Sequence, residues 1–116
     1  MEAPKIEAFH AINPWNYQEI IRYDWSLSYG EEVKRNMELW LGKWRDFSDF
    51  ERLKIKLYDI SIRGYNTIYF KGERTNISVI RKNSGYIFLD TYDGTDVLFE
   101  CNDFDFYLEQ VGFEEW

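Results

Sequence analysis

The residues best suited to chemistry in this chain are the carboxylates of its last thirty residues, 87–116. This stretch contains nine acidic side chains and no Lys or Arg. It also contains eight aromatic residues, so it is expected to fold rather than to form a solvated acidic tail. Folded carboxylates bind metal ions, exchange protons or attract cationic partners. The nine acids are Asp90, Asp93, Asp96, Glu100, Asp103, Asp105, Glu109, Glu114 and Glu115.

Metal binding is poorly supported by the spacing of these acids. In an EF-hand loop with Gly94 at its sixth position, the first and third ligands would be Leu89 and Thr91, which lack carboxylates. A hairpin turn explains the Asp-Gly pair more simply. The chain has a single His and a single Cys, which excludes the usual zinc ligand sets. We predict no metal and no cofactor.

Catalysis is equally weakly indicated. A nucleophilic pair would have to combine His10, in an expected N-terminal arm, with Cys101, which is expected to face the core as a small hydrophobe. Each glycine is isolated, so a phosphate-binding loop is absent from the sequence. Carboxylate pairs for acid–base work remain open, because nothing selects two of them. We predict a protein that is not an enzyme, with no catalytic residues.

Length and composition indicate one globular domain covering residues 1–116. The chain is 45% hydrophobic and 20% aromatic, which is enough for one core and favours sheet over helix. A net charge of -7 argues against direct binding to nucleic acid and against binding to anionic membranes. The single cysteine and the lack of an apolar leader-like run predict a cytoplasmic location.

The positioning elements are clearest in the second half, where β-rich runs alternate with turn residues. We predict an antiparallel meander of about five strands over residues 54–63, 67–71, 76–82, 86–92 and 95–101, with a β-bulge near Tyr58-Asp59. Asp93-Gly94 predicts a two-residue type I′ turn. The predicted pairs are Tyr92–Thr95, Asp90–Val97, Phe88–Phe99 and Tyr86–Cys101. This register puts Asp90 on an aromatic face, where it needs a partner, and we favour a structural role for it.

Helices are predicted at both ends of this meander. Asn13-Pro14 favours a helix over residues 15–25, and residues 33–44 fit a helix or a strand equally well. Asn102 is expected to cap a short helix that ends at Gly112, with the apolar stripe Phe104, Tyr107, Leu108 and Val111. The predicted fold class is α+β: one or two N-terminal helices, the meander, and a C-terminal helix packed on the sheet.

The charge map gives the main functional clue. Residues 54–86 carry a charge of +5 and residues 87–116 carry -9. Cross-strand pairs would neutralise about half of these acids, which leaves the rest for solvent or a partner. We predict a non-enzymatic acidic binding module for a basic protein partner. The predicted contact residues are Asp93, Asp96, Asp103, Asp105, Glu109, Glu114, Glu115 and Trp116.

In its small size, acidity and aromatic content, the chain resembles bacterial immunity proteins and antitoxins, and phage inhibitors that imitate nucleic acid. The resemblance is one of class and implies an inhibitor of a basic nuclease. One alternative is a small-molecule or saccharide-binding domain, with carboxylate catalysis, whose pocket is lined by Trp15, Trp25, Trp40 and Trp44. Another is nucleic-acid binding through the +5 segment with Tyr58, Tyr65 and Tyr69. Pairing of edge strands into a homo-oligomer is also open.

Overall fold

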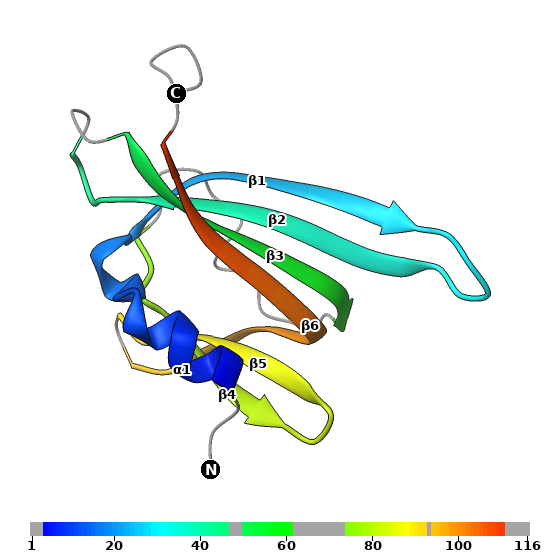
Figure 1. The fold of residues 1–116 in the computed structure, drawn as a ribbon. Coiled ribbons are helices and arrows are strands. Elements are labelled where there is room, and N and C mark those ends of the chain that lie inside the picture. The colour runs from blue at the N-terminus through cyan, green and yellow to red at the C-terminus, as the bar shows by residue number, and fades with distance from the viewer. Residues whose placement is uncertain (1–3, 47–49, 62–73, 93, 111–116) are drawn as a thin grey trace.

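The computed structural model describes residues 4–46, 50–61, 74–92 and 94–110. One helix and a 3₁₀ turn precede a six-stranded sheet (Figure 1). The elements are α1 (Pro4–Ala11), η1 (Pro14–Asn16), β1 (Glu19–Ser28), β2 (Lys34–Gly42), β3 (Glu51–Ser61), β4 (Ile77–Lys82), β5 (Gly85–Asp90) and β6 (Asp96–Gln110). The protein is therefore mostly β.

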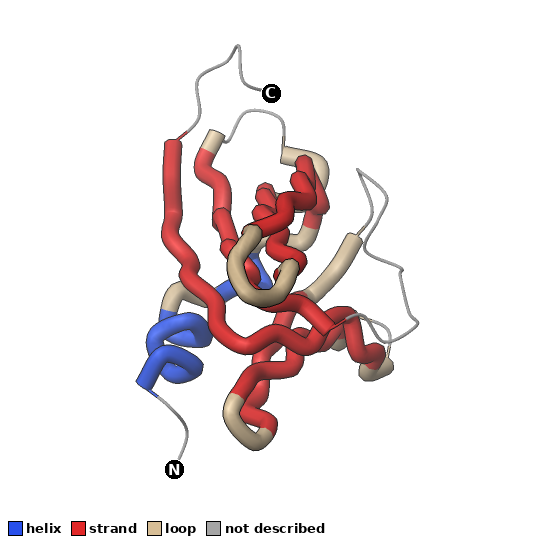
Figure 2. The backbone as a smooth tube through the Cα atoms, turned by 90° about the vertical axis from the view of Figure 1, so that its right-hand side faces the viewer, coloured by secondary structure: helices blue, strands red, loops and turns tan. Residues whose placement is uncertain are grey.

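The sheet is antiparallel throughout, with the order β1-β2-β3-β6-β5-β4. Strand β6 joins its two halves: residues from Glu100 onward pair with β3, and residues up to Cys101 pair with β5. The sheet curls until its two edges meet at one end, where Glu19 bridges Arg74 and the Thr75 amide donates to the Gln18 carbonyl at 2.8 Å. Figure 2 shows how far the strands wrap around the interior.

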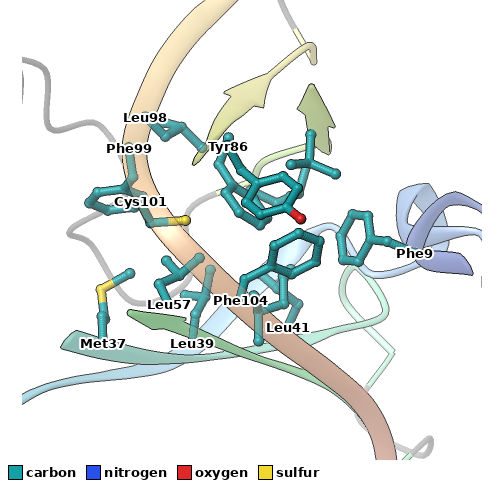
Figure 3. Packing of buried hydrophobic residues seen from close by; sticks show 14 of the residues in the cluster. Phe9, Met37, Leu39, Leu41, Leu57, Tyr86, Leu98, Phe99, Cys101 and Phe104 are labelled. Atoms are coloured by element: carbon teal, nitrogen blue, oxygen red, sulfur yellow. The ribbon is translucent and has the colours of Figure 1, made fainter. Parts of the chain in front are cut away.

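The core fills the concave side of this curled sheet (Figure 3). Helix α1 covers part of it with Ile6 and Phe9, both fully buried. The Phe9 ring meets Phe88, Phe104 and Phe106 edge-on, with centroids 5.2–6.0 Å apart. Burial of one such side chain contributes about 1.5–3 kcal/mol, so this small helix is anchored mainly by packing. His10, expected in an arm, lies in α1.

Strands β3 and β6 change face together. Leu57 and Ile60 are both buried although they are three residues apart, and so are their partners Phe104 and Cys101. Asp59 adopts a left-handed φ of 56° at this point. The change of face was predicted from the sequence, but the register between the strands does not shift, so the predicted bulge is wrong in form. Both strands kink instead, which lets one sheet enclose the core.

The predicted helix over residues 15–25 is wrong. Asn13 has φ 57° and makes no capping hydrogen bond, and the helical turn ends at Asn16. The chain then enters β1, where Tyr23, Trp25 and Leu27 on the inner side alternate with polar residues. Residues 33–44, left open between helix and strand, contain β2, in which Met37, Leu39 and Leu41 are buried. The N-terminal half therefore supplies strands as well as a helix.

The predicted C-terminal helix is also wrong, because β6 continues to Gln110. Phe104 and Phe106 face the core, while Asp103, Asp105 and Tyr107 face solvent, which is the two-residue period of a strand. The sequence spacing fitted a helix equally well. This segment forms a strand because it pairs with β3, which lies about fifty residues earlier in the sequence. The predicted strand over residues 67–71 lies outside the described residues.

The β5–β6 hairpin confirms part of the predicted register. Tyr86 pairs with Cys101 and Phe88 with Phe99, but a shift after Phe88 places Asp90 opposite Asp96 instead of Val97. Five residues, not two, connect the strands. At the end of β5, the Oδ1 of Asp90 accepts the amides of Asn76 at 3.1 Å and Tyr92 at 3.0 Å. Asp90 is therefore a structural residue that ends β5.

Candidate functional site

The candidate site lies on the solvent side of β1, β2, β3 and β6, which we call the outer face. Strand β6 contributes Asp103, Asp105, Tyr107 and Glu109 to it, because alternate residues of a strand share one side. Successive side chains along this row are about 7 Å apart. Because this segment is a strand and not a helix, three of the predicted contact residues, Asp103, Asp105 and Glu109, lie on the same side of β6.

The other predicted contact residues are not brought into this row by the described structure. Asp93, Glu114, Glu115 and Trp116 lie outside the described residues. Asp96 begins β6 opposite Asp90, at the other end of that strand from Glu109. The candidate site therefore rests on Asp103, Asp105 and Glu109.

Asp103 and Asp105 are held by neighbours from α1 and β3. The Lys5 Nζ lies 2.8 Å from Asp103 Oδ1 and 3.8 Å from Asp105 Oδ1. The hydrogen bond from Lys5 lowers the pKa of Asp103 and in turn raises the pKa of Lys5. The Tyr58 hydroxyl donates to Asp105 Oδ2 at 3.0 Å. Burial, followed by this bond to Asp105, raises the pKa of Tyr58.

A row of stacked cations and aromatic rings crosses the outer face beside Glu109. Arg22, Trp40, Lys54 and Tyr107 are consecutive partners on the four strands. Arg22 and Lys54 lie 4.8 and 4.7 Å from the Trp40 ring, and Lys54 lies 5.5 Å from the Tyr107 ring. The Trp40 Nε1 donates to Glu109 Oε1 at 2.9 Å. These contacts fix the side chains of the row.

The acids of the outer face reach solvent more than the lysines paired with them. The side chains of Asp103 and Asp105 are 57% and 58% exposed, whereas Lys5 is 34% exposed. Glu38 is 37% exposed, whereas Lys54, which it contacts at 3.4 Å, is only 15% exposed. The lysine charges are thus partly covered by aromatic rings and backbone. Arg22 on β1 is an exception, since it is 63% exposed and its partner Asp24 is 48% exposed. Along β6, an approaching molecule meets carboxylates first.

The sequence did not assign Lys5, Glu38, Trp40 and Tyr58 to this face; Trp40 and Tyr58 were considered only for the saccharide and nucleic-acid alternatives. Only the strand interpretation of residues 33–44 places Glu38 and Trp40 on the side opposite the buried Met37 and Leu39. Lys5 carried no signal, because its partner Asp103 is 98 residues away.

The four tryptophans proposed for a saccharide pocket lie in separate places. Trp15 is exposed on η1, Trp25 lies on the inner side of β1, and Trp40 lies on the outer face. Trp44 stacks with Arg45 and Arg74, at 4.7 and 5.0 Å. Trp25 and Trp40 therefore lie on opposite sides of the sheet.

The basic residues proposed for nucleic-acid binding are also dispersed in the described part of the segment. Lys54 and Lys56 contact Glu38 on the outer face. Arg74 stacks on Tyr92 at 4.5 Å where the two sheet edges meet. Lys82 pairs with Glu100. These positions form no single basic surface.

Cys101 and His10, the two side chains considered for nucleophilic catalysis, lie in different elements, β6 and α1. Cys101 is buried, and burial raises the pKa of its thiol to about 12. His10 Nε2 accepts the Val79 amide at 3.4 Å and lies 3.3 Å from Ser78 Oγ. In the described ranges, no three His, Cys, Asp or Glu side chains gather closely enough to hold a metal ion. No helix there has the length and apolar character needed to span a membrane.

Comparisons with protein-family models, with curated proteins and with solved structures found no match for this chain. Its function must therefore be argued from the outer face itself.

Proposed function

We propose that this protein is a non-enzymatic binding module whose outer face engages a basic protein partner. The observation that carries the proposal is the exposure of Asp103 and Asp105, which exceeds that of their lysine neighbour. The class of function that fits is an immunity protein, an antitoxin or an inhibitor that imitates nucleic acid.

The row along β6 combines the two features that such a contact requires. The carboxylates attract and orient a cationic surface, which speeds association more than it adds affinity. Tyr107, 38% exposed, lies between Asp105 and Glu109 and offers aromatic area for the buried centre of a contact. Since Lys5, Tyr58 and Trp40 already hold the acids in place, binding would require little reordering of them.

The partner expected here presents Lys or Arg side chains on a fixed surface. Arg and Lys donate charge-assisted hydrogen bonds to carboxylates, and the side chains of Asp103 and Asp105 are more than half exposed to such donors. Added salt is expected to slow association. A partner of this kind would bind through β6 without requiring any catalytic group in this chain.

The test separates the outer face from net charge. Asp103→Lys with Asp105→Lys and Glu31→Lys with Glu32→Lys raise the net charge equally, but only the first pair lies on β6. Partners captured from the native host would be identified by mass spectrometry, and the association rate of the purified pair measured by biolayer interferometry. We expect the β6 variant to lose binding by at least about tenfold and the Glu31/Glu32 variant to retain it. Equal binding by both variants would reject the proposal, provided that thermal melting shows both to be folded.

A further inference from the structure

The second half of β6, residues 103–110, has a neighbouring strand on one side only, within the part of the chain that the structure describes. Strand β3 pairs with it along its whole length, whereas β5 pairs with β6 only up to Cys101. Figure 2 shows this end of β6 at one margin of the sheet, where it leads toward the C-terminus. We call the side of residues 103–110 that faces away from β3 the β6 edge.

The contacts of Phe104 show which main-chain groups point toward the β6 edge. Its amide donates to Asp103 Oδ1 at 2.8 Å, and its carbonyl accepts the Lys5 Nζ at 2.9 Å, so both groups point away from β3. Main-chain groups alternate in direction along an antiparallel strand. The register with β3 stays regular from here to the end of β6. The amides and carbonyls of Phe106 and Leu108 therefore point to the β6 edge as well.

The edge-facing groups of Phe106 and Leu108 are available, unlike those of Phe104. Within the described ranges, no hydrogen bond occupies the edge-facing amides and carbonyls of Phe106 and Leu108. The Leu108 side chain is 41% exposed, and the neighbouring Tyr107 is 38% exposed. Unpaired amides and carbonyls on a strand edge can pair with another strand. The β6 edge thus has both the main-chain groups and the solvent access that an added strand requires.

The side chains beside the β6 edge differ between the two faces of the sheet. On the outer face, Asp105 and Glu109 are acidic. On the inner side, Phe106 and Leu108 are apolar and incompletely buried. The side chains of an added strand would alternate between these two surroundings. A strand in which Lys or Arg alternates with apolar residues complements both.

A second copy of this chain is a poor occupant of the β6 edge. A symmetric antiparallel pair centred on Tyr107 places Asp105 of each copy opposite Glu109 of the other. Like charges opposite each other destabilise a strand pair. A basic segment gains attraction from the same acids. Charge complementarity therefore favours a basic segment over self-association.

We propose that the basic partner contributes an extended segment that adds to the sheet as a further strand along the β6 edge. Its main chain hydrogen-bonds to Phe106 and Leu108, and its apolar side chains cover them on the inner side. Its Lys or Arg side chains lie beside Asp105 and Glu109 on the outer face. In this mode of recognition, main-chain pairing gives affinity and alternate side chains give specificity. The inference rests on the proposed function, because it describes how that same partner binds.

The first test uses a short peptide in which Lys and Val alternate, with hydrogen exchange of the full chain followed by NMR. We expect the peptide to slow exchange of the Phe106 and Leu108 amides. The control peptide has the same sequence with every amide N-methylated, so it keeps its charge but cannot donate to a strand. We expect it to bind at least about tenfold more weakly. Equal binding of the two peptides, or no protection of Phe106 and Leu108, would overturn strand addition.

The second test blocks the β6 edge without changing any charge. Leu108→Pro removes the edge-facing amide, and proline is tolerated where a strand amide points away from its neighbour. Leu108→Ala keeps this amide and is the matched control. We expect Leu108→Pro to bind the Lys/Val peptide at least about tenfold more weakly than Leu108→Ala, with both shown to be folded by thermal melting. Equal binding by the two variants would reject strand addition.

A third variant separates this inference from the proposed function. If Asp103→Lys with Asp105→Lys loses peptide binding while Leu108→Pro retains it, the outer face attracts a basic partner without strand addition. If both variants retain binding, the proposed function fails as well. Sedimentation of the chain alone tests the other occupant. A dimer that Leu108→Pro dissociates and Leu108→Ala does not would assign the β6 edge to a second copy and overturn the proposal.

Discussion

The two edge strands of the sheet are protected in different ways. At β4, helix α1 covers the edge: Phe9 is buried beneath it, and His10 Nε2 accepts the Val79 amide at 3.4 Å. At β1, the described residues provide no such cover, and apolar side chains reach solvent. A side chain that accepts an edge amide blocks pairing with a second chain. The comparison shows that α1 protects β4, whereas the protection described for β1 is limited to the bridge from Glu19 to Arg74.

The largest expected loss of stability follows a change in α1, the helix that covers the β4 edge. Phe9→Ala removes a fully buried ring that meets three other rings, and such changes cost about 3–5 kcal/mol. The matched change on β1, Leu27→Ala, removes a side chain that is half exposed and is expected to cost less than about 1 kcal/mol. Urea unfolding monitored by tryptophan fluorescence measures both. Equal losses of stability would remove the contrast between the edges.

The accuracy of the sequence predictions depended on how far apart in the chain the paired residues lie. The pairs Tyr86–Cys101 and Phe88–Phe99 were predictable because a short connection brings them together. The pairing near the end of that hairpin was not predictable, since Asp90 there accepts the amide of Asn76, which lies just before β4 and 14 residues earlier in the chain. Phe104, Phe106 and Leu108 fit a strand only when β3 is known to lie beside them. Local spacing alone was ambiguous there.

The same contrast between local and distant contacts applies to the candidate site. Asp103, Asp105 and Glu109 were selected from the sequence because they exceed the nearby positive charge, and the structure brings them into one row. Their neighbours Lys5, Tyr58 and Trp40 come from three other elements. A contact such as Lys5–Asp103 depends on the whole fold, so no local pattern reveals it.

The second-largest expected effect concerns the hydrogen bond from the Val79 amide to His10 at the β4 edge. His10→Ala leaves the Val79 amide without this acceptor and is expected to destabilise the fold by about 1 kcal/mol. More informatively, it opens the β4 edge to pairing. We expect the variant to self-associate more than the natural chain, measured by sedimentation, because the Val79 amide at the β4 edge can then pair with another strand. If assembly is unchanged, the helix protects β4 by coverage and not through His10.

A third prediction concerns the end of the β1–β2 hairpin, residues 26–36, which extends past the last β2–β3 pair and which we call the arm. Asn36 Nδ2 donates to Ser28 Oγ at 2.8 Å, and its Oδ1 accepts the Asp59 amide at 3.1 Å, which ties the arm to the kink in β3. Asn36→Ala removes both bonds and is expected to cost about 1 kcal/mol or less, because the site is partly solvated. Hydrogen exchange of the arm amides is expected to accelerate, while that of β4 amides stays constant. Uniform acceleration in both regions would show that the arm has no local role.

The smallest expected effect lies where α1 reaches β6 through Lys5. The pKa of Asp103 is lowered and that of Lys5 is raised, the first cause of each being their hydrogen bond. The lowered pKa of Asp103 stabilises the fold above its unfolded value of about 3.9, and this contribution disappears as pH falls through the folded value. The raised pKa of Lys5 stabilises the fold below about 10.4, and this contribution disappears as pH rises.

Lys5→Met is therefore expected to lower stability only on a plateau between about pH 5 and 10. The loss is a few tenths of a kcal/mol, because Asp103 is more than half exposed and solvent screens the pair. Chemical denaturation across this pH range measures it, and the same change in an Asp103→Asn background provides the control, in which the plateau is expected to shrink to the smaller contribution of Asp105, 3.8 Å from Lys5. A pH-independent difference would instead assign the role of Lys5 to packing of its alkyl chain near Phe104. In that case α1 would cover β4 through apolar contacts and His10, with no electrostatic contribution from its link to the outer face.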